Sequence, residues 1–266
     1  GMCLYKLNHF DDAVSLCEEA IRIDPKCETA YFYLAEMMEE IEDPEASINY
    51  YYKALEENPD SYLAYFFLGN YFQKLKLYKN ATKFYKNCIQ KNPNFVHAIS
   101  SIADIMSKFE RYNEEIYYLK KIIDIDNQNS EAFNKIGIAL NNLENYSEAN
   151  ERFLDAIYLS PEYEDAYANL GNNLIKLGRL HDAYECLNKT LEFNISSEKA
   201  YVGLDLLHLI SHDYCNEKEH TEKFNNVSKK DIKDFLKNLN MNKKNFTTKF
   251  LTEKIYPQLA TDDCIL

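Results

Sequence analysis

The chain has 266 residues and a formal net charge of −13, and 46% of its residues are hydrophobic. A content of only 6 Gly and 6 Pro argues against a loop-rich fold or a β-sandwich and favours helices. The acidic balance argues against nucleic-acid binding, because contacts to phosphates need clustered cations.

The first part of the chain carries most of the negative charge. Residues 1–60 hold 15 Asp and Glu against 4 Lys and Arg, whereas residues 61–129 hold 6 against 10. A field of this sign favours a partner that is basic where it meets the N-terminal end. The alternative is an acidic surface that only keeps the protein in solution.

A spacing of 34 residues recurs from the first predicted helix onward, without insertion or deletion. One column of this repeat holds prolines, at Pro25, Pro59, Pro93 and Pro161. An aromatic or branched column follows, at Tyr31, Tyr65, Ile99, Phe133, Tyr167 and Tyr201. A column of small residues comes four positions later, at Ala35, Gly69, Ala103, Gly137 and Gly171, and ends with Asp205. So many columns with one common spacing are not expected by chance.

Each period predicts two amphipathic helices, because its apolar residues lie three and four positions apart. The small residues let helix axes approach closely, and the proline ends one unit before the next begins. In chain order the sequence predicts a partial repeat at 1–27, full repeats at 28–61, 62–95, 96–129, 130–163 and 164–197, and a degenerate repeat from 198 to 215. A single unit cannot bury its own apolar face, so neighbouring units must stack.

This pattern resembles the tetratricopeptide repeat (TPR) family. The residues of the fifth full repeat that carry the match are Tyr167, Leu170, Gly171, Leu174, Gly178, Leu180, Ala183 and Leu187. The resemblance covers about residues 1–215 and implies an all-α fold, a right-handed superhelical solenoid of helix-turn-helix repeats. Its first helices would line a concave groove that holds a peptide or a partner helix. Residues 216–266 then predict C-terminal capping helices, with a separate partner-binding tail as the alternative.

Two zones of the predicted groove are candidate binding sites. The N-terminal zone offers an apolar anchor site rimmed by carboxylates, with Asn70 beside it; its residues are Phe32, Tyr33, Glu36, Phe66, Phe67 and Asn70. The second zone offers amides, which both donate and accept hydrogen bonds and so suit a peptide backbone; its residues are Asn134, Asn141, Asn169 and Asn172. The alternative is that the aromatic rings pack between helices and that the amides are ordinary members of an Asn-rich chain.

Signs of catalysis are scarce. The sequence has no phosphate-binding loop, dinucleotide fingerprint, nucleophile elbow or zinc-protease motif. Asp205, His208, His212 and Cys215 share one face of a predicted helix and are zinc-ligand types, although a polar face near the cap explains them as well. We therefore expect no cofactor and no enzymatic activity.

The first hypothesis for function is a non-catalytic scaffold or adaptor that binds a protein or peptide in the groove. The second is a regulatory or targeting segment of a larger enzyme or multi-subunit complex, since the first repeat opens partway through a helix. No apolar run is long enough to span a membrane and no signal peptide is recognisable, so we expect a cytoplasmic protein. Solenoid ends left uncovered would allow self-association.

Overall fold

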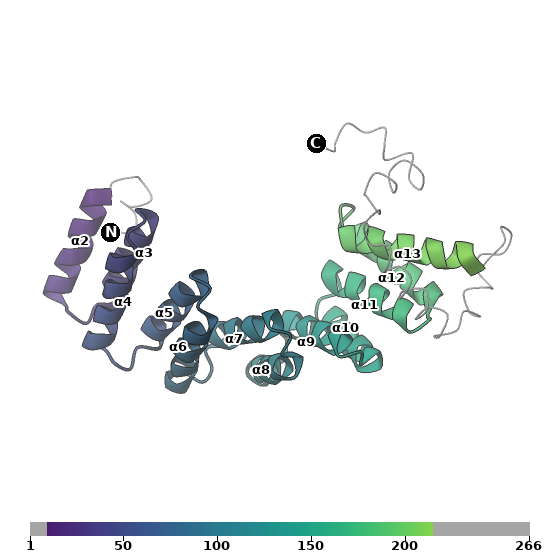
Figure 1. Ribbon diagram of the computed structural model, residues 1–266, viewed down its shortest axis with the longest axis horizontal. Coiled ribbons are helices and arrows are strands. Elements are labelled where there is room, and N and C mark those ends of the chain that lie inside the picture. The colour runs from purple at the N-terminus through teal and green to yellow at the C-terminus, as the bar shows by residue number, and fades with distance from the viewer. Residues whose placement is uncertain (1–9, 215–266) are drawn as a thin grey trace, which may run out of the picture. The chain divides into compact units, whose positions relative to one another are not determined.

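The computed structural model describes residues 10–214, which form twelve α-helices and no strand (Figure 1). The prediction of an all-α fold of repeated helix pairs is confirmed. In chain order the helices are α2 (Phe10–Ile23), α3 (Glu28–Glu40), α4 (Pro44–Glu57), α5 (Tyr62–Lys74), α6 (Tyr78–Lys91), α7 (Val96–Lys108), α8 (Tyr112–Ile125), α9 (Ser130–Asn142), α10 (Tyr146–Leu159), α11 (Glu164–Lys176), α12 (Leu180–Phe193) and α13 (Glu198–Tyr214). The capping helices predicted for residues 216–266 lie outside the described residues.

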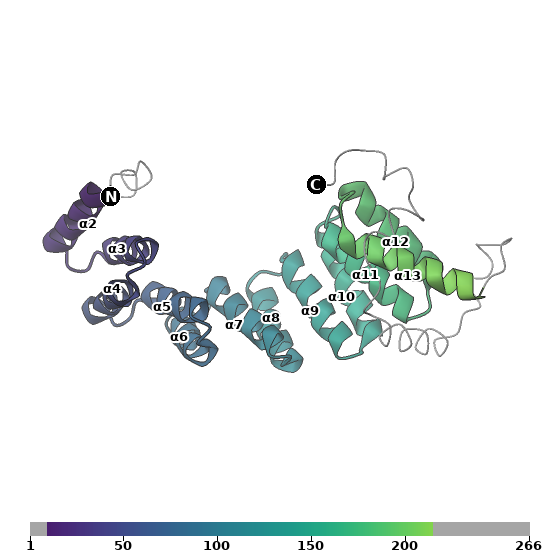
Figure 2. The same ribbon diagram turned by 45° about the horizontal axis from the view of Figure 1, so that its top comes forward.

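The helices recur with the spacing of the sequence columns. First helices begin at Glu28, Tyr62, Val96, Ser130, Glu164 and Glu198, and each is followed by a second helix of the same repeat up to α12. Each first helix packs along its own second helix, as α5 does on α6 and α11 does on α12 in both views (Figures 1 and 2). The next first helix then packs on that second helix, as α7 does on α6.

The described helices form two compact units, one of α2–α8 and one of α9–α13. We refer to them as unit 1 and unit 2. In both, a further column of small residues with the same period is buried, and all of its alanines have 0% exposure: Ala13, Ala81, Ala149 and Ala183. Close approach of the helix axes at these positions is what the sequence pattern required.

The turn inside each repeat places one residue in the left-handed region. Glu42, Lys76, Glu110 and Glu144 have φ between 57° and 60° there, and Gly178 has φ 78°. This conformation costs an L-residue about 1–2 kcal/mol relative to a right-handed one, and only glycine adopts it freely. In four repeats the turn therefore keeps this conformation although the residue that adopts it is not a glycine.

Side chains at the start of some first helices satisfy free backbone N–H groups. Ser61 Oγ accepts a hydrogen bond from the Ala64 N–H at 3.0 Å, and Asn129 Oδ1 accepts one from the Ala132 N–H at 2.9 Å. Ser61 also donates to Glu28 Oε2 at 2.5 Å, which ties the start of α5 to the start of α3. The caps and this contact fix where consecutive first helices begin.

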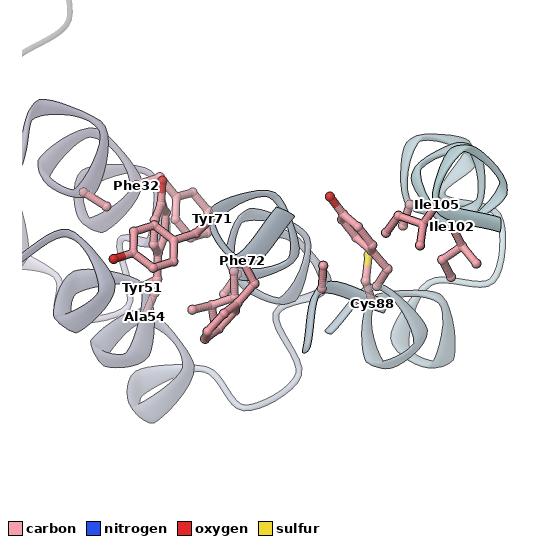
Figure 3. Packing of buried hydrophobic residues seen from close by; sticks show 14 of the residues in the cluster. Phe32, Tyr51, Ala54, Tyr71, Phe72, Cys88, Ile102 and Ile105 are labelled. Atoms are coloured by element: carbon pink, nitrogen blue, oxygen red, sulfur yellow. The ribbon is translucent and has the colours of Figure 1, made fainter. Parts of the chain in front are cut away.

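The core of unit 1 is rich in aromatic rings. Phe32, Tyr51 and Tyr71 lie together, and Phe72 continues the cluster toward the next repeat (Figure 3). The second helices meet the first helices where the small column leaves room, since a Cβ on Gly69 would lie 2.4 Å from the Tyr85 ring. Cys88 is fully buried with a free thiol, and burial raises its pKa to about 12.

Candidate functional site

The side chains at the predicted groove positions lie on the first helices, and within each unit we call the surface of these helices the first-helix face. In unit 1 it belongs to α3, α5 and α7, and in unit 2 to α9, α11 and α13. The structure shows which of the predicted binding residues already have partners within the protein.

Phe32 lies inside the repeat packing and is 6% exposed. Its ring centroid is 4.6 Å from that of Phe67 and 6.4 Å from that of Tyr51. Phe67 in turn stacks on Tyr51, with centroids 6.0 Å apart and planes 8° from parallel. These contacts join the first and second full repeats, so Phe32 is a packing residue whose surface is nearly all covered.

Phe66 and its neighbours remain partly exposed. The Phe66 ring meets Phe95 edge to face at a centroid distance of 5.0 Å, and His97 lies 5.4 Å from Phe95. Phe66, Phe67 and Phe95 are half-buried and His97 is exposed. We call these four residues the ring patch. It offers apolar ring surface held in place by ring-to-ring contacts.

The carboxylates beside the rings differ in their surroundings. Glu39 accepts a hydrogen bond from the Tyr51 hydroxyl at 3.1 Å and forms an ion pair with Lys74. Glu36 and Glu40 are exposed and form no ion pair with any described residue. Partial desolvation raises the pKa of Glu36, and the like charges of Glu39 and Glu40 raise it further, while Lys74 lowers it.

The predicted amides of unit 2 join neighbouring first helices. Asn169 Nδ2 donates to Asn134 Oδ1 at 2.9 Å, and Asn134 Nδ2 donates to the Tyr163 hydroxyl at 3.2 Å. Asn134 is consequently 4% exposed. Lys176 Nζ donates to Asn141 Oδ1 at 2.6 Å. The amides of α9 thus already bind side chains of α11.

Some hydrogen-bonding capacity of these amides remains. Asn169 uses its Nδ2, Asn141 uses its Oδ1, and Asn172 uses its Nδ2 to donate to the Lys199 carbonyl at 3.3 Å. Asn169 Oδ1 and Asn141 Nδ2 have no partner among the described residues, which leaves one acceptor and one donor on half-buried side chains.

Lys74 and Lys176 were not among the predicted binding residues, although each is bonded to a polar residue of the preceding first helix. Glu39 and Lys74, Asn134 and Asn169, and Asn141 and Lys176 are each 35 residues apart. The signal was present in the sequence, because a spacing one residue beyond the repeat period pairs polar positions of consecutive first helices. Burial lowers the pKa of Lys176 by disfavouring its charged form.

Asn70 lies at the edge of an open cleft of about 600 Å³ in unit 1. The Tyr85 hydroxyl reaches both Asn70 Oδ1 at 2.8 Å and Gln73 Oε1 at 2.9 Å. Lys74, Lys76 and Lys108 also line this cleft. Of the residues that line this cleft, only Asn70 was among the predicted binding residues.

The candidate metal ligands cannot be assembled from the described side chains. Asp205 is half-buried and His208 exposed, whereas the side chain of His212 and all of Cys215 lie outside the described part. Among the described residues, no three His, Cys, Asp or Glu side chains are placed to hold a metal ion. Burial raises the pKa of Asp205 to about 6.

None of the helices between residues 10 and 214 combines the length and the apolarity that crossing a bilayer requires.

Models of the tetratricopeptide repeat match residues 1–62, and a second set of matches covers residues 62–95 and 164–194. No curated protein matches the chain. Among solved structures, YrrB, a TPR protein with an unusual peptide-binding site, is 21% identical, with a TM-score of 0.59 over 71% of this chain and 97% of its own.

Two further structures are similar in fold. PilF of Pseudomonas aeruginosa is 18% identical, with a TM-score of 0.58 over 70% of this chain and 85% of its own. MamA of Desulfovibrio magneticus RS-1, from its residue 41 onward, is 18% identical, with a TM-score of 0.57 over 64% of this chain and 97% of its own. At these identities the likeness concerns the fold.

Proposed function

The chain belongs to the tetratricopeptide repeat family, and from that premise we propose that it is a non-catalytic scaffold that binds a peptide segment of a protein partner on its first-helix face. Repeat proteins of this family are generally interaction modules without catalytic activity. The observation that carries the proposal is the set of partly exposed rings and half-used amides on that face.

The ring patch supports an apolar anchor in unit 1. Phe66 and Phe67 are half-buried and fixed by their neighbours, so a partner side chain would meet rings that lose little freedom on binding. Anchor residues that enter such preformed apolar surfaces dominate many interfaces. Phe32 supports this site from below, because it packs on Phe67.

The amides support backbone recognition in unit 2. Asn141 Nδ2 can donate to a peptide carbonyl, and Asn169 Oδ1 can accept from a peptide N–H. Because their other amide atoms are already bonded within the protein, these side chains are oriented before a ligand arrives. Recognition of this kind depends little on the side chains of the peptide.

The carboxylates support a partner that is basic near the first full repeat. Glu36 and Glu40 are exposed, and Glu39 adds its charge although it is paired with Lys74. YrrB, which is similar in fold, has a peptide-binding site, and this is a precedent for a peptide ligand on such a fold.

The test is affinity capture from the source cell with a variant of the first-helix face and a matched control. The face variant is Glu36→Ala/His97→Ala, in which both substituted residues are exposed. The control is Glu56→Ala/Tyr117→Ala, which removes an exposed carboxylate and an exposed ring from second helices.

The proposal expects a partner that is captured by the wild type and by the control but depleted with the face variant. Both variants must melt at the wild-type temperature, which their exposure favours. Equal capture by the face variant and the control would exclude the unit 1 part of the first-helix face as the binding surface. Asn141→Ala then tests unit 2 separately in the same assay.

A further inference from the structure

The cleft in unit 1 differs in charge from the face beside it. It lies between the C-terminal parts of α5 and α7, and its lining residues are Asn70, Gln73, Lys74, Lys76, Tyr78, Asp104, Ile105 and Lys108. Its volume of about 600 Å³ falls within the range of small-ligand pockets. Three ammonium groups face one carboxylate among these residues, although the chain as a whole is acidic.

Two of the three lysines have no carboxylate partner among the described residues. Lys74 is paired with Glu39, which leaves Lys76 and Lys108. Lys108 Nζ lies 5.0 Å from the centroid of the Tyr78 ring, a contact that places the ammonium without using its N–H donors. Both lysines are exposed, so their charges are available to a ligand.

The same repeat positions have the opposite charge in the first full repeat. Lys74 and Lys76 occupy the positions that Glu40 and Glu42 hold one period earlier. Lys76 sits in the turn with φ 59°, as Glu42 does, so the backbone presents both side chains in the same way. Along one face, an acidic repeat is therefore followed by a basic one.

Amide donors complete the cleft. The Tyr85 hydroxyl, fully buried and with a pKa that burial raises to about 12, stays protonated and contacts the amide oxygens of Asn70 and Gln73. Their amide N–H groups have no partner among the described residues. Ile105 and the Tyr78 ring add apolar wall. Ammonium groups, amide N–H donors and a short apolar wall suit the carboxylate and methylene groups of an acidic side chain.

We propose that this cleft binds a Glu or Asp side chain of the peptide that lies on the first-helix face. The inference rests on the proposed function and adds a direction to it, because Phe66 and Asn70 are one turn apart on α5. The ligand then has basic residues beside Glu36 and Glu40, an apolar residue on the ring patch, and an acidic residue at Lys76 and Lys108.

Nucleic acid is a poorer occupant for the same cleft. Two unpaired ammonium groups match one or two carboxylates, whereas a polyanion meets the field of a chain with net charge −13. Lys76 and Lys108 are also arranged around a cleft, which accommodates a side chain better than it follows a phosphate backbone.

The test uses two synthetic probes and the full chain. One probe is a fluorescein-labelled, acetylated octapeptide that alternates Glu and Leu, and the other carries Gln in each Glu position. The cleft variant is Lys76→Gln/Lys108→Gln. The matched control is Lys79→Gln/Lys83→Gln, which removes two exposed lysines of α6 that do not line the cleft.

We expect the Glu probe to bind the wild type and the control alike, and to bind the cleft variant about tenfold more weakly, since two charge-assisted contacts are lost. The Gln probe should bind wild type about tenfold more weakly than the Glu probe. The difference between probes should shrink when the ionic strength rises from about 0.05 M to about 0.5 M. Fluorescence anisotropy reads all of these affinities.

The outcomes separate this inference from the proposed function. If the Glu and Gln probes bind equally well and neither responds to the cleft variant, the acidic subsite is refuted while peptide binding stands. Equal losses with the cleft variant and the control would refute it too, because any surface lysine would then serve. If neither probe binds, the inference fails, and partner capture with Glu36→Ala/His97→Ala decides the proposed function by itself.

Discussion

The contact between Gly137 and Phe153 makes a quantitative test of the repeat packing. A Cβ built on Gly137 would lie 2.5 Å from Phe153 Cε1 and 2.7 Å from Cδ1, and Phe153 is 0% exposed. Because the ring is enclosed, it can yield only by moving its neighbours. Overpacking of this kind costs about 1–3 kcal/mol, whereas replacing a helical Gly by Ala gains about 1 kcal/mol of helix propensity. We therefore expect Gly137→Ala to destabilise the protein by up to about 2 kcal/mol.

Gly137→Ala is the first variant of a double-mutant cycle, and the second is Phe153→Leu. Alone, Phe153→Leu opens a void and lowers the free energy of unfolding by about 1–2 kcal/mol. In the double variant the added methyl group occupies space that the ring has vacated. The third full repeat holds this combination naturally, with Ala103 and Leu119 in the equivalent positions, both almost fully buried. The double variant should accordingly be more stable than the sum of the single effects by about 1 kcal/mol or more.

Urea unfolding followed by circular dichroism measures all four proteins. In the first full repeat an Ala stands at the position of Gly137 and an aromatic residue at that of Phe153. This pair is tolerated because the Tyr51 ring stacks on Phe67. Phe153 has no ring partner among the described residues, so its ring cannot be accommodated by stacking in the same way. Single effects that add within about 0.5 kcal/mol, or a Gly137→Ala protein more stable than wild type, would refute the packing argument.

Four further substitutions test other parts of the structure by the same unfolding or melting measurements. Glu144→Gly should stabilise by up to about 1 kcal/mol and Gly178→Ala should destabilise by about as much, because the turn needs a positive φ; equal effects of both would contradict this. Asn173→Ala should cost about 2–3 kcal/mol, since its buried Nδ2 donates to the Tyr146 carbonyl at 2.7 Å and to Asn150 Oδ1 at 2.5 Å; a loss below about 0.5 kcal/mol would show that water replaces it. Asp205→Asn should raise the melting temperature by about 2–4 °C near pH 7.5. Near pH 4 its effect should vanish, because a folded-state pKa of about 6, above the unfolded value of 3.8, means that ionisation disfavours the fold; a benefit equal at both pH values would contradict the assigned cause.

The fold could be predicted because the residues that pack between helices recur at the same positions of every repeat. Ala81, Ala149 and Ala183 recur where helix axes meet, and all are fully buried. The spacing of the columns also survives without insertion, so the helices recur in the same register along the chain. A period repeated this often overrides local exceptions such as Glu115, which stands in the same column and is 4% exposed.

The burial of individual site residues could not be predicted from the period. Phe32 and Phe66 occupy equivalent positions in consecutive repeats, yet Phe32 is 6% exposed and Phe66 half-buried. The difference comes from the next repeat, because Phe67 packs on Phe32 whereas Ser101 stands at the equivalent position after Phe66; both rings lie near the tyrosine of their own second helix, Tyr51 or Tyr85. Helical spacing tells which side a residue is on but not how large the side chains beside it are.

Glu39 and Asn134 show the same limit for polar residues. Their types and positions favour a ligand site, but each is bonded to a residue 35 positions further on, Lys74 and Asn169. A polar group at the border between two repeats is satisfied by the next repeat before any ligand is present. Candidate residues on such a face therefore have to be chosen by the atoms that remain unbonded.

The pairs at 35-residue spacing also connect binding with stability. A peptide that contacts Asn141 and Asn169 touches both sides of the interface between α9 and α11, and one that reaches Glu36 and Lys76 spans two repeats of unit 1. Because stability in repeat proteins is a sum of units and of interfaces between neighbours, such a ligand strengthens an interface term as well as occupying a surface. The same contacts explain why partner binding and folding would fail together when a buried member such as Phe32 is replaced. Variants at Glu36, His97, Lys76 and Lys108 avoid this, since their exposure separates the loss of binding from the loss of the fold.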